Sequence, residues 1–278
     1  MKWNIITDSS CDLIDLENGN ADITFSDVPF VIRVNDKDYI DCKELDAEDM
    51  MHAMKECREA STTACPAPYS WYEKFQKDGN IIAITISKNL SGSYNSAEIA
   101  KNMILDDEPE RKIVILNSYS TGPALTLAVY HIIDLIKKGL SFEEVALQAK
   151  EYIKNIHTAF ALCSFDNLVK SGRISKIKGQ LASIMNFWGI GNATDEGTIN
   201  VKEKVRGRKK AISAIIEEMK ANKPYGNKVV IAHCFNSAFA ERLKCEIEKV
   251  WNSVETVIMQ TRGLNSYYAD MGGIIVSY

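Results

Sequence analysis

Short runs of β-branched and aliphatic residues alternate with longer helical patterns along almost the whole chain. Three such runs lie at residues 3–7, 81–86 and 112–116, and a helix-length pattern follows each of the last two. Strands separated by helices of this length predict βαβ units and a mainly parallel sheet. The first half of the chain is therefore predicted to be a parallel sheet flanked by helices.

Helix-start signals support this interpretation. A polar cap or a proline opens three of the predicted helices, at Asp46, Pro68 and Pro123. Ser141 and Glu144 match the capping box, which predicts a helix over residues 142–156.

The second half of the chain changes character. Residues 158–163 predict a strand, and two helical stretches follow, one on each side of Gly172 and Arg173. A hairpin is predicted next, with its turn at residues 195–197. Later strands and helices alternate, at 199–205, 208–221, 229–233, 237–251 and 254–259.

The predicted fold class is therefore a two-lobed α/β protein. Its N-terminal lobe, residues 1–158, is expected to hold the mainly parallel sheet flanked by helices. Its C-terminal lobe, residues 159–278, is expected to hold a mixed sheet with helices. Because no long linker separates the lobes, we expect them to pack closely, with a ligand in the crevice between them.

Composition excludes several classes of protein. The net charge of −4 argues against a protein that coats nucleic acid, although it leaves room for local basic patches. No apolar run approaches the roughly 18 residues of a membrane span. The first residues turn polar too early to form a signal peptide. Seven scattered cysteines without a C-x-x-C pair indicate reduced thiols in a cytoplasmic protein, with no metal site.

Hydroxyl side chains gather where predicted strands end. Three such segments lie at residues 7–10, 90–93 and 118–122, and a fourth, 61–66, leads into a helix. In an open α/β sheet, ligands bind outside the carboxyl ends of the strands. Hydroxyls and helix N-termini there can donate to an oxyanion. The alternative is that these residues only cap helices.

Enzyme motifs are absent from these segments. The sequence has neither a P-loop nor a dinucleotide-binding glycine motif. Ser91 follows Leu90 and so lacks the nucleophile elbow of a hydrolase, and Cys65 would need a distant histidine as its partner. Of the four isolated histidines, His233 at a strand end is the one expected closest to a cleft.

Basic residues crowd the segment 202–210, which contains six lysines and arginines. One interpretation is a solvated edge strand, because lysines discourage edge-to-edge pairing. The other is a docking face for an acidic partner or a nucleic acid. Without interleaved aromatic residues, base stacking has little support.

Six segments carry motifs in the order and spacing of one known family. They are ITDSSCDL at 6–13, TACPAP at 63–68, ITISKNLSGSYNSA at 84–97, NSYSTGPAL at 117–125, FDNLVKSGRISKIKG at 165–179 and VKEKVRGRKKAI at 201–212. On these motifs the chain resembles, from end to end, the DegV family of two-lobed fatty-acid-binding proteins.

The resemblance implies a long-chain fatty acid, such as palmitate or oleate, buried between the lobes. Its carboxylate would be held by Thr63 and Ser91. The resemblance also implies presentation of the carboxylate to a fatty-acid kinase subunit, with no cofactor beyond the bound lipid. The remaining ligand-site residues are predicted to be Gly92, Ser93, Ser120 and Thr121. The predicted partner-docking residues are Arg173, Arg206 and Arg208.

One departure concerns the C-terminal segment YYADMGGIIVSY. The family commonly carries a histidine where this chain has Tyr268, whose phenol can donate to a carboxylate but cannot carry imidazolium charge. We therefore add Tyr268 to the predicted ligand site. The chain is predicted to be a non-catalytic carrier. The alternatives are a hydrolase acting on a small acid or acyl phosphate in the same crevice, and a nucleic-acid-associated regulator.

Overall fold

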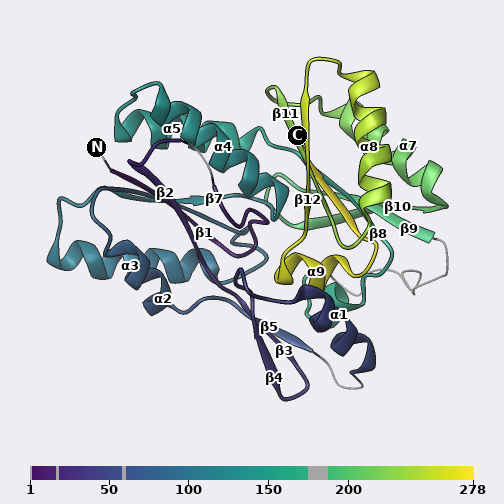
Figure 1. Cartoon of the computed structure of the whole chain (residues 1–278), viewed down its shortest axis with the longest axis horizontal. Helices are drawn as coiled ribbons and strands as arrows, with labels where there is room; N and C mark the ends of the chain where they lie inside the picture. Colours follow the sequence, from purple (N-terminus) through teal and green to yellow (C-terminus); the bar gives the residue numbers. More distant parts are fainter. Residues whose placement is uncertain (1, 17–18, 58–60, 175–186) are drawn as a thin grey trace.

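The computed structural model describes residues 2–16, 19–57, 61–174 and 187–278 (Figure 1). This part of the chain contains two large β-sheets and a three-stranded sheet, with helices packed on their faces. In Figure 1 the purple and teal first sheet and the green and yellow second sheet occupy opposite halves of the molecule, and the small sheet projects below them. The predicted two-lobed α/β fold is confirmed.

The first sheet has four parallel strands in the order β2-β1-β6-β7. The strands are β1 (Trp3–Asp8), β2 (Ile23–Val28), β6 (Asn80–Thr85) and β7 (Ile113–Asn117). Every residue of β1 and β6 is buried. A strand that is covered on both faces has a continuous apolar run rather than an alternating pattern, which explains the runs in the sequence.

Two pairs of helices cover this sheet. They are α2 (Pro68–Phe75), α3 (Ser93–Asp107), α4 (Pro123–Lys137) and α5 (Phe142–Lys154). Helices α2 and α3 pack against Ile6 and Ile81 on one face. Helices α4 and α5 pack against Ile5 and Ile82 on the other face. Neighbouring residues of one strand thus fill opposite cores, as the period of two requires.

The predicted helix starts are confirmed. Asp46 caps α1 (Ala47–Glu56), and its Oδ1 accepts hydrogen bonds from the amides of Glu48 and Asp49 at 3.0 and 2.9 Å. Ser141 and Glu144 form the predicted capping box at the start of α5. The prolines of α2 and α4 occupy the first helical turn.

The second sheet has six strands in the order β10-β9-β8-β13-β11-β12. The strands are β8 (Thr158–Leu162), β9 (Phe187–Ala193), β10 (Ile199–Arg206), β11 (Lys228–His233), β12 (Glu255–Gln260) and β13 (Ile274–Ser277). The β11–β12 pair is parallel and the other pairs are antiparallel, so the sheet is mixed as predicted. Helices α7 (Arg208–Ala221) and α8 (Ser237–Val250) cover one face.

A small antiparallel sheet belongs to the first half of the sequence but packs on the second sheet. Its strands are β3 (Val31–Val34), β4 (Lys37–Ile40) and β5 (Thr62–Ala64). Ile32 of β3 and Met50 of α1 share one core with Phe160 and Ile275 of the second sheet. The same core includes residues of α6 (Asp166–Lys170) and α9 (Gly263–Ala269). The helical stretch predicted after Gly172 and Arg173 lies outside the described residues.

Candidate functional site

An apolar cavity lies between the carboxyl end of the first sheet and the second sheet. The cavity and the solvent-filled space at its opening together measure about 830 Å³. Segments that leave β6 and β7 form one wall. The rest comes mainly from β8, the β9–β10 hairpin and α9, with single residues from β5, α6, β13 and two loops. The apolar wall residues include Phe30, Ile86, Leu90, Phe160, Leu162, Leu168, Ile199, Leu264 and Ile275. Ligands were predicted at this edge of the sheet.

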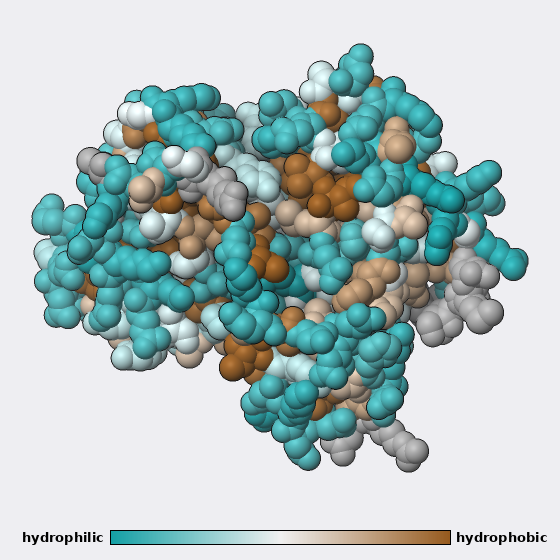
Figure 2. Space-filling model, viewed as in Figure 1, coloured by the Kyte–Doolittle hydropathy of each residue, from teal (hydrophilic) through white to brown (hydrophobic). Residues whose placement is uncertain are grey.

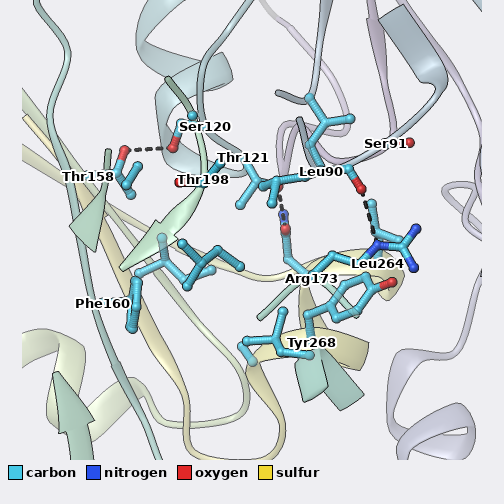
Figure 3. A pocket seen from close by; sticks show the side chains of 18 of the residues that line it. Leu90, Ser91, Ser120, Thr121, Thr158, Phe160, Arg173, Thr198, Leu264 and Tyr268 are labelled. Atoms are coloured by element: carbon cyan, nitrogen blue, oxygen red, sulfur yellow. Dashed lines mark hydrogen bonds between the residues drawn. The ribbon is translucent and has the colours of Figure 1, made fainter. Parts of the chain in front are cut away.

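Four polar side chains form what we call the arginine cluster: Thr63, Ser91, Arg173 and Tyr268. All four line the cavity and all are half-buried, so solvent reaches this part of the wall. The hydroxyls of Thr63 and Tyr268 are 2.8 Å apart. Arg173 donates from Nε to the carbonyl of Leu90 at 3.1 Å. In Figure 3 the Arg173 guanidinium and the Tyr268 phenol lie on the same side of the cavity.

A second polar group lies on the buried part of the wall. Ser120 donates to Thr158 Oγ1 at 2.8 Å (Figure 3). Thr158 Oγ1 also lies 2.8 Å from Ser277 Oγ. We call these three residues the hydroxyl chain. Beside them Thr121 donates to Asn265 Oδ1 at 2.7 Å. The predicted site residues Ser120 and Thr121 therefore both lie on the cavity wall.

The structure places Gly92 and Ser93 off the cavity wall. Ser93 donates its hydroxyl hydrogen to Asp8 Oδ2 at 2.6 Å, and the Ile86 amide donates to the same oxygen at 3.0 Å. Burial raises the pKa of Asp8 above its ordinary value. The Ser93 hydroxyl thus satisfies a buried carboxyl of the protein itself. Gly92 occupies the N-cap position of α3 and leaves space for the neighbouring Cys65 thiol.

The basic segment lies apart from the cavity. Arg206 and Arg208 are exposed, at the end of β10 and the start of α7, and neither lines the cavity. Strand β10 is an edge strand of the second sheet, as the solvated-edge interpretation predicted. Lys202 is paired with Glu218, with 2.7 Å between Nζ and Oε2. The Arg206 guanidinium lies 5.9 Å from the centre of the Phe187 ring.

Helix α9 supplies the cavity with Leu264, Asn265, Tyr268 and Ala269, and carboxylates from the first half of the chain hold its start. Asp41 accepts from the amides of Gly263 and Leu264 at 2.8 and 2.9 Å. Asp12 accepts from the amide of Arg262 at 2.8 Å and from the side chain of Asn265 at 2.9 Å. Sequence reasoning missed these residues, because each carboxylate is distant in sequence from the helix it caps.

The Arg262 side chain connects Asp41 to a further carboxylate, Asp27. Its side chain is about 5% exposed. Nη2 donates to the carbonyl of Asp41 at 2.6 Å and forms an ion pair with Asp27, 2.6 Å from Oδ2. Its Nε lies 3.7 Å from Asp41 Oδ1. One buried guanidinium therefore joins the end of β2, the loop before α1 and the start of α9.

No histidine, cysteine or carboxylate is among the described residues that line the cavity. His131 stacks on Tyr152, and His233 Nδ1 accepts from the Asn236 amide at 3.2 Å. No group of His, Cys, Asp and Glu side chains in the described ranges could hold a metal ion. No helix in those ranges combines the length and apolar character needed to cross a membrane.

The fold and the cavity define a class of protein: a two-lobed α/β protein with a mostly apolar cavity between its sheets, whose wall also carries hydroxyls and a guanidinium. The chain belongs to the DegV family, since the family model described as "Uncharacterised protein, DegV family" matches residues 2–273. A DegV domain-containing protein of Streptococcus pyogenes is 37% identical over 278 residues, which is 100% of this chain and 99% of that protein.

Solved structures give the same result. The Fatty Acid Kinase (Fak) B3 protein of Streptococcus pneumoniae, loaded with linoleic acid, is 38% identical with a TM-score of 0.96, covering 100% of this chain and 99% of that one. A DegV family protein from Eubacterium eligens, loaded with heptadecanoic acid, is 30% identical with a TM-score of 0.94, covering 99% and 98% of the two chains. The predicted family is therefore confirmed.

Proposed function

We propose that this protein binds one long-chain fatty acid in the cavity between its two lobes, residues 1–158 and 159–278. The observation that carries the proposal is an apolar cavity whose half-buried side bears hydroxyls and a guanidinium, while its opposite side is deeply buried. The fatty acids bound to the Streptococcus pneumoniae and Eubacterium eligens proteins support it. We propose a carrier rather than an enzyme, in the cytoplasm, where its seven free cysteines would stay reduced.

The carboxylate would lie at the arginine cluster and the tail in the buried part of the cavity. Most of the affinity would come from the tail, since about 15 methylenes at ~0.8 kcal/mol each give roughly 12 kcal/mol before the cost of association. A single hydroxyl donor to a carboxylate contributes only about 1.5–3 kcal/mol. We propose Thr63, Ser91 and Tyr268 as these donors, with Arg173 supplying positive charge.

Ser91→Ala is expected to weaken binding of palmitate or oleate about ten- to a hundred-fold without abolishing it, because one charge-assisted hydrogen bond is lost. Displacement of a fluorescent fatty acid from delipidated protein would measure the change. Ser213→Ala, on the exposed face of α7, is the matched control. Equal affinity of Ser91→Ala and the control would remove Ser91 from the carboxylate site.

Native mass spectrometry of protein purified from cells would separate a carrier from the alternative hydrolase. A co-purifying long-chain acid in one-to-one ratio supports the carrier. An empty cavity together with turnover of an acyl phosphate or a small acid supports the hydrolase. The described cavity wall offers a hydrolase no histidine or acid to activate a nucleophile.

We further propose that the bound carboxylate is presented to a kinase partner. The partner would transfer the terminal phosphoryl group of ATP to a carboxylate oxygen, which yields an acyl phosphate and ADP. The name Fatty Acid Kinase of the Streptococcus pneumoniae protein supports this role. Arg206 and Arg208 are the proposed docking residues. Arg173 is a third, although its place on the cavity wall gives it a second role toward the lipid.

The Arg206→Ala and Arg208→Ala double variant is expected to slow association with the host's kinase subunit severalfold at low salt, and less at high salt. Its affinity for oleate should stay that of the wild type, because neither residue lines the cavity. Surface plasmon resonance at several salt concentrations, together with lipid displacement, would measure both.

The Tyr268→His variant tests the departure from the family at this position. If neither this variant nor the wild type yields acyl phosphate with ATP and the kinase subunit, the kinase role fails.

A further inference from the structure

The buried part of the cavity wall carries the hydroxyl chain. Ser120 and Thr158 are 6% and 4% exposed, and Ser277 is fully buried. Ser277 pairs with Thr158 across the antiparallel β8 and β13 strands. Ser120 and Thr158 line the cavity, whereas Ser277 does not. Under the proposed function, the Ser120 and Thr158 hydroxyls border a part of the cavity that a plain hydrocarbon tail would occupy.

The three hydroxyls carry three protons, but the chain contains only two contacts between them. Ser120 gives its proton to Thr158. One more proton lies between Thr158 and Ser277, and either oxygen can be its donor. One proton is therefore left over. Within the described ranges, no other group accepts a hydrogen bond from Thr158 or Ser277.

The surplus proton belongs on Thr158. If Thr158 donated to Ser277, the unused proton would lie on a fully buried hydroxyl away from the cavity, which is costly. If Ser277 donates instead, the unused proton is that of Thr158, which borders the cavity. The second arrangement lets the contents of the cavity supply the missing acceptor.

We infer that the cavity favours acyl chains that carry an oxygen substituent, such as a hydroxyl or keto group, where the tail passes Thr158. This inference rests on the proposed function and names its substrate class more closely. A methylene chain has no acceptor and leaves the Thr158 proton unpaired. A tail oxygen accepts that proton, so its own desolvation is offset by a hydrogen bond.

The test uses delipidated protein and competitive displacement of a fluorescent fatty acid. The competitors are octadecanoic acid, octadecanoic acids with one hydroxyl or keto group moved stepwise along the chain, and octadecenoic acids with a double bond moved in the same way. We expect one short range of positions at which the oxygenated acid binds about three- to ten-fold tighter than octadecanoic acid, the size of one hydrogen bond. The octadecenoic acids should show no such gain there.

Variants of Thr158 test whether its hydroxyl is the source of the tighter binding of oxygenated acids. In Thr158→Val the affinity ratio of oxygenated to plain acid should fall to about one, since the shape is kept and the donor is lost. Thr158→Ser should keep the gain, which also covers the case that the valine variant fails to fold. Thr24→Val is the matched control, because Thr24 is exposed on β2 and does not line the cavity.

The outcomes separate this inference from the proposed function. If octadecanoic acid binds and no oxygenated acid binds tighter, the inference fails and fatty-acid binding stands. A gain that survives Thr158→Val, or an equal gain for a double bond, would also overturn it. If Thr158→Val weakens octadecanoic acid as much as Ser91→Ala does, the carboxylate lies at the hydroxyl chain and the inference fails. If no acid binds at all, the proposed function itself fails.

Discussion

Arg262→Met is expected to destabilise the protein by about 3–5 kcal/mol, the usual cost of removing one partner from a buried ion pair. The guanidinium is enclosed, and its loss leaves Asp27 and Asp41 without their shared cation. The hydrogen bond to the carbonyl of Asp41 is lost as well. Urea unfolding followed by tryptophan fluorescence would measure the change. In a thermal scan it corresponds to a fall of roughly 6–15 °C in Tm.

The same variant should impair lipid binding, although Arg262 does not line the cavity. Asp41 caps the start of α9, and α9 carries Leu264 and Tyr268 on the cavity wall. Arg242→Met, on the exposed surface of α8, is the matched control and should change stability by less than about 0.5 kcal/mol. A change in Arg262→Met no larger than in the control would mean that the carboxylates hold α9 without the guanidinium.

Much of the fold could be predicted from the sequence, because continuous apolar runs and cap signals are local. The strands at 81–86 and 112–116 and the helix after Ser141 are examples, and the structure confirms them within a few residues. Strand β2 was missed because only its ends, Ile23 and Val28, are buried, so it lacks an apolar run. Strand β5 was missed because it has three residues and depends on pairing with β3.

The position of the cavity could also be predicted in part. The segments that leave β6 and β7 were expected to meet because the carboxyl ends of parallel strands share one edge of a sheet, and Ser91, Ser120 and Thr121 do line the cavity. Thr158 and Ser277 could not be linked to this site, because their pairing depends on the antiparallel β8–β13 register. Helix α9 has no local cap signal, since its capping carboxylate, Asp41, is more than 200 residues away in sequence.

Asp12 should make the stability of the wild-type protein fall, relative to Asp12→Asn, as pH rises from about 4 to about 7. Burial raises the pKa of Asp12 from its ordinary value of 3.8 to about 7, against the opposing hydrogen bonds from Asn265 and Arg262. Between these two pH values the folded protein holds a proton that the unfolded chain has already released. Each unit of pH in this window therefore costs the wild type up to about 1.4 kcal/mol.

Asp12→Asn is a suitable reference because it resembles the protonated carboxyl. Asp12 Oδ1 accepts both observed hydrogen bonds, and an amide oxygen can accept them equally well. Asp12 Oδ2 is buried and has no hydrogen-bond partner, so a proton or an amide nitrogen at this position breaks no hydrogen bond. Asp8 and Asp41, whose pKa values burial also raises, are present in both proteins, so the difference between the two unfolding curves reports Asp12 together with its charge interaction with Asp41.

The pH titration of that difference has a defined shape. It should be flat below about pH 3, change by a few kcal/mol in favour of Asp12→Asn between about pH 4 and 7, and be flat again above about pH 8. The opposite sign, with the wild type gaining stability as pH rises, would mean that Arg262 keeps Asp12 ionised.

The same ionisation should reach the cavity, because Asn265 joins Asp12 to Thr121 on the cavity wall. If ionised Asp12 loosens the start of α9, oleate affinity measured over the same pH range should follow the ionisation of Asp12.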